Sequence, residues 1–128
     1  MRKRIVSVAL AIAATATTAV MAAPPATANV GGLYLGINQN LQPLPAMFFT
    51  NSVANLGSSG QGDLASSAQN TDTSAWVLFD DRNYRDRRYC LPPGGYIANL
   101  HSGSWNFGDK TSSVLRLGTA SCAGYPTF

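Results

Sequence analysis

The chain has no glutamate, a single histidine and only two cysteines among its 128 residues. One histidine without glutamate cannot supply the ligands of a catalytic zinc site. Cys90 and Cys122 lack the CxxC spacing of redox and zinc motifs. Serine and aspartate are present beside His101, but no Gly-x-Ser-x-Gly elbow marks a nucleophile. These absences predict that the protein is not an enzyme.

Charge is also scarce, at 12% of the residues, and the formal net charge of +3 rests on Arg2, Lys3 and Arg4. The remainder of the chain carries six basic side chains and six aspartates, so it is neutral. A neutral surface has no long-range field to attract an anionic polymer. We therefore expect no nucleic-acid partner, and the same neutrality argues against an antimicrobial, membrane-disrupting surface.

Residues 1–28 are typical of an export signal: a basic start, the uncharged apolar stretch Ile5–Met21, and Ala26–Ala28 as a small-x-small cleavage site. The apolar stretch is short and rich in Ala and Thr, which argues against a bilayer-spanning anchor. We expect cleavage before Asn29, with a cut near Ala22 or Ala23 as the alternative. The mature protein would then be secreted, extracellular and free of the membrane.

Export makes a disulfide between Cys90 and Cys122 the expected pairing, because secreted compartments are oxidising. Closing a loop of this length stabilises a domain by roughly 3–4 kcal/mol in the chain-entropy model. The bond would tie the C-terminal tail, residues 119–128, to the rest of the domain.

The segments after residue 29 are short, apolar or aromatic, and separated by Gly, Pro, Asn, Asp and Ser. Such segments predict β-strands, and no window shows the 3.6-residue apolar period of a helix. We expect an all-β sandwich or barrel-like fold, with the polar stretch Ala65–Ser74 as a linker between two halves. The predicted strands are 33–35, 47–49, 76–79, 88–91, 95–97 and 113–117.

The chain repeats itself at an interval of about 42–46 residues. Val53–Ser58 matches Ile97–Ser102, and the Gly-Asp-x-x-Ser-Ser block at Gly62–Ala68 matches the block at Gly108–Val114. Each unit is long enough for a four-stranded Greek key, and two such units can pack face to face. The predicted organisation is one domain over 29–128, with Greek keys at about 31–72 and 75–118 and a tail at 119–128.

These residues resemble the βγ-crystallin superfamily, and more closely the secreted bacterial peptidase inhibitors of that fold, which are metalloproteinase-inhibitor-like. The resemblance is best in the second unit, in Phe79-(x4)-Tyr84-x-Asp86, in Leu91–Tyr96 and in Trp105–Val114. It implies a sandwich of two Greek keys. Asp86 stands where the superfamily has a glycine with positive φ, and both Gly-Asp-x-x-Ser-Ser blocks begin with Gly instead of Asn or Asp.

The resemblance also implies a calcium site at the two blocks, since carbonyl, hydroxyl and carboxylate oxygens suit Ca²⁺. In the superfamily the site is completed by the partner unit's hairpin. The alternative is structural, because Asp and Ser close loops by bonding their own backbone. Carried over, the ligands would be the Leu64 and Lys110 carbonyls and the Ser66 and Ser112 hydroxyls, with Asp63, Asp109, Asp80 or Asp81 nearby.

The leading functional hypothesis from the resemblance is a monomeric, secreted proteinase inhibitor that blocks an extracellular protease with an exposed loop. Gln42–Thr50, Gly57–Gly62 and His101–Phe107 are the candidate loops, and the sequence selects none of them. The alternative is a non-catalytic extracellular module, either structural or Ca²⁺-binding.

One stretch concentrates the charge, and the aromatic residues are spread along the chain. Asp80–Arg88 is interpreted as a solvated hairpin whose charges neutralise one another, with a docking loop as the alternative. We expect the large aromatic side chains in the core and at corners, not on a carbohydrate-stacking face. These side chains are Trp76, Phe79, Tyr84, Tyr96, Trp105 and Phe107.

Overall fold

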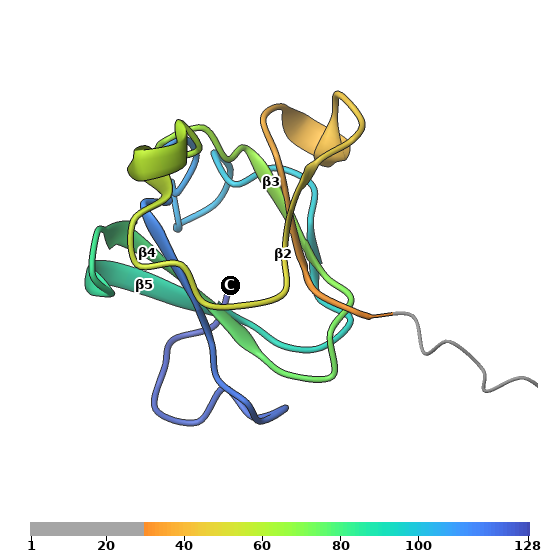
Figure 1. Ribbon diagram of the computed structural model, residues 1–128, viewed down its shortest axis with the longest axis vertical. Coiled ribbons are helices and arrows are strands. Elements are labelled where there is room, and N and C mark those ends of the chain that lie inside the picture. The colour runs from red at the N-terminus through yellow and green to blue at the C-terminus, as the bar shows by residue number, and fades with distance from the viewer. Residues whose placement is uncertain (1–29) are drawn as a thin grey trace, which may run out of the picture.

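A computed structural model describes residues 30–128, and the expected export signal lies outside this range. The described part is a pair of antiparallel β-sheets with only two short 3-10 helices, η1 (Gln39–Leu41) and η2 (Leu56–Ser59). Figure 1 shows the strands, with the loops between them arching over one end. Within residues 30–128 no helix is long and apolar enough to span a bilayer.

The seven strands form one four-stranded and one three-stranded sheet. The first sheet has the order β2-β1-β3-β6 and the second the order β5-β4-β7, with every pairing antiparallel. The strands are β1 (Leu33–Gly36), β2 (Met47–Phe49), β3 (Ser67–Asn70), β4 (Trp76–Asp81), β5 (Arg85–Leu91), β6 (Tyr96–Ile97) and β7 (Ser113–Arg116).

The two units exchange their third extended segments. β6 comes from the second unit but pairs with β3 in the first sheet. Conversely, Val53 of the first unit bridges Val114 of β7 through two backbone hydrogen bonds of 2.9 and 3.0 Å. This arrangement confirms the predicted sandwich of two Greek keys. In the first unit, the third segment is reduced to that single bridge.

The linker predicted at Ala65–Ser74 is wrong, because this stretch contains β3, an inner strand of the first sheet. Two of its polar side chains, Ser67 and Asn70, are buried and hydrogen-bonded within the protein. Ser67 Oγ donates to the Asn38 carbonyl, and Asn70 Nδ2 donates to the carbonyls of Ser74 and Leu91. A buried polar group that is fully hydrogen-bonded is tolerated in a core, so polarity did not indicate exposure here.

Alternate residues of the facing strands form the core between the sheets. Trp76 and Leu78 of β4 meet Leu33 and Leu35 of β1, with Phe107 beside them, and all five are fully buried. Phe79 is also buried in a second cluster around Cys90. The core expectation is wrong for Tyr96, whose side chain is 48% exposed because residue 96 of β6 faces away from the core.

The C-terminal tail covers the Cys90 end of the β5 edge of the second sheet. The predicted disulfide joins Cys90 to Cys122, and Thr127 forms a parallel bridge with Cys90. Phe128 then packs against the rings of Tyr89 and Trp105. A covered edge strand cannot pair with another chain, so the disulfide and the tail together protect this edge.

Candidate functional site

The two Gly-Asp-x-x-Ser-Ser blocks lie side by side and cross. The Asp63 N–H donates to the Thr111 carbonyl at 3.0 Å, and the Asp109 N–H donates to the Ala65 carbonyl at 2.9 Å. Both aspartates have a φ of 56°. The crossing therefore carries the aspartate of each block to the serine of the other block.

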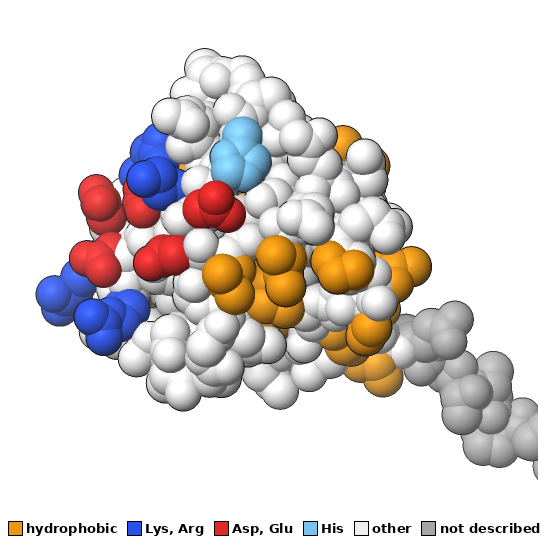
Figure 2. Space-filling model, turned by 90° about the horizontal axis from the view of Figure 1, so that it is seen from above, with side chains coloured by type: hydrophobic (Ala, Val, Ile, Leu, Met, Phe, Trp, Pro, Cys, Tyr) orange, Lys and Arg blue, Asp and Glu red, His pale blue; other side chains and the backbone are white. Residues whose placement is uncertain are grey.

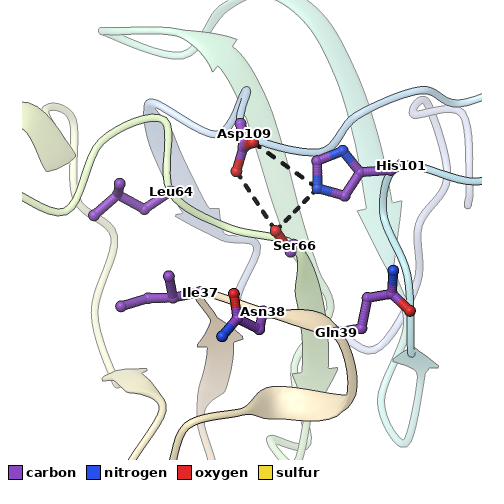
Figure 3. Close-up of a pocket in the computed structure, with 7 residues that line it drawn as sticks. All are labelled: Ile37, Asn38, Gln39, Leu64, Ser66, His101 and Asp109. Carbon is purple, nitrogen blue, oxygen red and sulfur yellow. Dashed lines mark hydrogen bonds and ion pairs between the residues drawn. The ribbon is translucent and has the colours of Figure 1, made fainter.

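Two pockets with equivalent positions result from this crossing. The histidine pocket is lined by Ile37, Asn38, Gln39, Leu64, Ser66, His101 and Asp109 (Figure 3). The asparagine pocket is lined by Asn55, Gly57, Ser58, Gly62, Asp63, Arg82 and Ser112.

In the histidine pocket, Ser66, His101 and Asp109 form a triangle in which Ser66 Oγ also lies 3.5 Å from Asp109 Oδ1 (Figure 3). His101 Nε2 is 3.0 Å from Ser66 Oγ and 3.9 Å from Asp109 Oδ2. A catalytic triad uses opposite ring nitrogens for the serine and the aspartate. Here one nitrogen faces both, so this Ser, His and Asp do not form an activated nucleophile.

The first glycine of each block makes room for the residue that approaches it. A Cβ on Gly108 would lie 2.1–2.2 Å from atoms of the His101 ring. At the equivalent Gly62, a Cβ would lie 3.1 Å from the backbone nitrogen of Gly57. The repeat aligns Gly57 with His101. The asparagine pocket therefore has no side chain where the histidine pocket holds an imidazole.

Several oxygen atoms lie close together at the asparagine pocket. Ser112 Oγ donates to Asp63 Oδ1 at 2.9 Å and lies 3.3 Å from the Lys110 carbonyl oxygen. Asn55 Oδ1 is buried and has no hydrogen-bond partner within residues 30–128. In the other unit, the equivalent Asn99 Oδ1 accepts from the His101 N–H at 3.0 Å. Asn55, with its unpaired oxygen, thus lines the same pocket as the Asp63 carboxylate and the Ser112 hydroxyl.

Comparison with known proteins finds matches by structure but not by sequence. No family model and no curated protein match the sequence. The structure resembles the βγ-crystallin from Ciona intestinalis, at 27% identity and a TM-score of 0.59, over 67% of this chain and 99% of that one. A βγ-crystallin domain from Flavobacterium johnsoniae matches at 23% identity and 0.53, over 69% and 98%.

Spherulin 3A from Physarum polycephalum matches at 22% identity and a TM-score of 0.54, over 66% of this chain and 80% of the spherulin chain. This chain has the βγ-crystallin fold. The neighbours support the superfamily, while the narrower resemblance to peptidase inhibitors stays a prediction.

On this βγ-crystallin framework, the predicted calcium ligands separate into two groups. Asp63, Lys110 and Ser112 meet at the asparagine pocket, as do Leu64, Ser66 and Asp109 at the histidine pocket. The hairpin at each pocket is the one from the same unit as the serine, whereas the resemblance implied the partner unit's hairpin.

Asp80 and Asp81 are engaged elsewhere. Asp80 pairs with Arg87 at 3.1 Å, and Asp81 Oδ1 accepts from the Arg82 N–H at 2.8 Å. The Asp80–Arg88 hairpin is thus partly self-neutralised, as expected. Arg87 also donates to the Trp105 and Asn106 carbonyls and so fixes the neighbouring loop.

Asn55 was missing from the predicted site, although the repeated Ala-Asn-Leu triplet contained a signal. The triplet occurs at 54–56 and 98–100, which shows that both units use an asparagine at the same turn. Within residues 30–128 no three His, Cys, Asp or Glu side chains form a metal cluster. A cation at either pocket would therefore depend on amide, hydroxyl and carbonyl oxygens beside one carboxylate.

The three loops considered for protease contact differ in what they expose. Leu44, between Pro43 and Pro45, is 71% exposed and precedes β2. The Gly57–Gly62 segment offers only Gly, Ser and Gln side chains. In His101–Phe107, Phe107 is buried and Trp105 packs against Phe128. Only the first loop presents a large apolar side chain to solvent.

Proposed function

We propose that this chain is a non-catalytic extracellular βγ-crystallin module that binds Ca²⁺ weakly at the asparagine pocket. One observation supports this above the others: the crossing of the two blocks brings Asp63 onto Ser112 beside the buried, unpaired Asn55 oxygen. An unpaired buried acceptor is costly, and a cation at that point would satisfy it. The extracellular location rests on the export signal expected from the sequence.

The ligand chemistry suits calcium, at low affinity. Ca²⁺ takes about six to eight oxygen ligands and accepts carbonyls, amides, carboxylates and water. The pocket supplies the Asp63 carboxylate, the Asn55 amide oxygen and the Ser112 hydroxyl, with the Lys110 carbonyl beside it. With a single carboxylate, we expect a Kd on the order of 10⁻⁴–10⁻³ M, the range of extracellular modules.

Arg82 is the one cationic side chain at this pocket. It is exposed, and the ion pairs within residues 30–128 do not involve it. An exposed arginine can turn toward solvent at small cost when a divalent ion binds. In the histidine pocket, by contrast, the His101 imidazole already contacts Ser66 Oγ and leaves the oxygens less accessible.

Thermal unfolding with and without Ca²⁺ tests the proposal. At ten times the Kd, one site stabilises the folded state by about 1.4 kcal/mol. For a domain of this size, that raises the Tm by roughly 5–10 °C. Asp63→Asn should abolish the rise, while the matched variant Asp109→Asn should keep it. A Tm of the native protein that is the same in millimolar CaCl₂ and in EDTA would contradict the proposal.

Proteinase inhibition is the second candidate, and the exposure of Leu44 favours it. A protease cleft binds an extended segment, and a preformed loop loses little conformational freedom on binding. Pro43 and Pro45 restrict the backbone on both sides of Leu44, which suits such a loop.

Titration against a thermolysin-type metalloprotease and a subtilisin-type serine protease tests this second candidate. We expect saturable inhibition near one-to-one that Leu44→Gly abolishes and the control Ser58→Gly leaves intact. Absence of inhibition by the native protein at micromolar concentration would remove this function and leave the calcium proposal untouched.

A further inference from the structure

We propose that the outer face of the four-stranded sheet is a glycan-binding surface for a neutral β-1,4-linked polysaccharide. The site is a row of four side chains in register across all four strands: Phe48, Tyr34, Gln69 and Tyr96. It is separate from both pockets and does not depend on calcium.

The strand register creates the row. Tyr34 of β1 pairs with Phe48 of β2 on one side and with Gln69 of β3 on the other. Gln69 in turn pairs with Tyr96 of β6. Paired residues point to the same face of a sheet. Since Leu33 and Leu35 face the core, all four members of the row face solvent.

The two rings at one end are packed against each other and onto the backbone. The centroids of Tyr34 and Phe48 are 4.5 Å apart, with 33° between the ring planes. A Cβ on Gly32 would lie 2.6–2.8 Å from the Phe48 ring. Phe48 nevertheless stays 42% exposed. The absence of a side chain at Gly32 thus lets this ring lie against the sheet and keep an open surface.

At the other end, Tyr96 is 48% exposed and its hydroxyl donates to Asn40 Oδ1 at 3.3 Å. Adjacent strands are about 4.8 Å apart, so the backbone positions from which Tyr34 and Tyr96 project, two strands apart, are separated by roughly 10 Å. In a β-1,4-linked glycan, every second sugar presents the same face, at a repeat close to this spacing. The apolar C–H faces of sugars pack on aromatic rings.

The polar atoms in the row also suit a sugar. Gln69 lies between the two tyrosines and offers both amide donors and an amide acceptor. The phenol groups of Tyr34 and Tyr96 add hydroxyls on either side. A purely apolar docking face for a protein would not need this alternation of rings and hydrogen-bonding groups.

The charge distribution favours a neutral ligand. Residues 30–62, 67–70 and 89–100 contain no Asp, Glu, Lys, Arg or His, so all four strands of this sheet are uncharged. In Figure 2 the exposed hydrophobic side chains are gathered apart from most of the charged ones. A charged polysaccharide would find no counter-charge on this face. A neutral one matches it.

Adsorption to insoluble polysaccharides tests the proposal with the purified protein. Microcrystalline cellulose and chitin present neutral β-1,4 chains, and amylose is the α-linked control. We expect saturable binding to cellulose or chitin, unchanged by EDTA, and no comparable binding to amylose. Failure to adsorb to both β-1,4 polymers, or equal adsorption to amylose, overturns the proposal.

Variants distinguish stacking on the aromatic rings from nonspecific hydrophobic adsorption. Tyr96→Ala should weaken binding roughly three- to tenfold, and Tyr96→Phe should keep most of it. Leu44→Ala removes a side chain that is 71% exposed and outside the row, so it should have no effect. Circular dichroism checks that each variant is folded. Equal loss with Leu44→Ala, or a dimer that Tyr96→Ala dissociates, would contradict glycan binding.

Discussion

At the scale of single residues, the pair of equivalent positions 101 and 57 distinguishes the two pockets most clearly. His101 occupies the place that Gly57 leaves open, and Gly108 lets its ring enter. Both pockets have an aspartate and a serine from different units. Because both pockets share the crossing, we attribute the expected weaker cation binding at the histidine pocket to the His101 imidazole.

Replacing His101 by glycine should create a second calcium site. The change frees Ser66 Oγ and the Asp109 carboxylate from the ring that now contacts them. Calorimetric titration is expected to show one Ca²⁺ per native chain and a second one for His101→Gly. Adding Asp109→Asn to that variant should remove the second ion only. A stoichiometry that stays at one would show that the ring does not block the pocket.

The ion pair between Asp72 and Arg116 controls stability at low pH. The guanidinium donates to both carboxylate oxygens and holds the pKa of Asp72 well below its ordinary value, while burial opposes this and the Trp76 indole N–H assists it. A lowered folded-state pKa stabilises above the unfolded pKa, about 3.9, and that contribution is lost as pH falls toward the folded pKa.

Urea unfolding of Asp72→Asn measures this pair. At neutral pH the variant should be less stable by about 1.5–3 kcal/mol, the range for charge-assisted hydrogen bonds. Below about pH 3.9 the difference from the native protein should shrink, because the Asp72 carboxylate then becomes protonated in the unfolded state while the folded state keeps it ionised, which favours unfolding of the native protein. A difference that stays constant from neutral pH to pH 2 would contradict this role.

At the scale of elements, the β4–β5 hairpin contains a departure from the superfamily pattern, the aspartate at position 86 in place of glycine. Asp86 has a φ of 68°, the left-handed region that glycine tolerates best. Asp86→Gly should therefore raise the free energy of unfolding by up to about 1 kcal/mol. Arg85→Gly, at the adjacent strand position, should instead lower it by roughly 0.5–1 kcal/mol. Equal effects of the two changes would show that no strain is relieved at residue 86.

The sequence predicted most strands because they are apolar segments between turn residues, and the repeat indicated two Greek keys. It did not predict β3, whose Ser67 and Asn70 look like linker residues and are buried with hydrogen-bond partners. The repeat also showed that Asp63 and Asp109 are equivalent, but equivalence does not say which serine each one meets. That pairing depends on the crossing of two segments far apart in the chain.

At the scale of the whole molecule, the disulfide holds the tail against the β5 edge. Replacing Cys90 and Cys122 by serine should cost roughly 3–4 kcal/mol of stability, from the entropy of the opened loop. The tail should also become protease-sensitive, because the β-bridge of Thr127 forms with Cys90, the residue that the disulfide fixes to the tail. Urea unfolding and limited proteolysis measure the two effects. In the native protein, thiol labelling without reductant would contradict the bond.

Charge and apolar surface are also segregated over the whole molecule. The first sheet is uncharged, and the charged side chains are concentrated in the second Greek key and the crossing blocks. The calcium proposal belongs to the crossing and the glycan proposal to the uncharged sheet. The Asp63→Asn variant should therefore lose calcium binding and keep glycan binding, and Tyr96→Ala should weaken glycan binding and leave calcium binding unchanged.

A two-dimensional NMR titration of the ¹⁵N-labelled protein with Ca²⁺ tests the central claim most directly. If the crossed blocks form a calcium site at the asparagine pocket, the side-chain amide of Asn55 and the backbone amides of Asp63 and Ser112 will shift with millimolar Ca²⁺. The signals of Ser66 and Asp109 will stay in place. Shifts confined to Ser66 and Asp109, or no shifts at either pocket, would contradict the account.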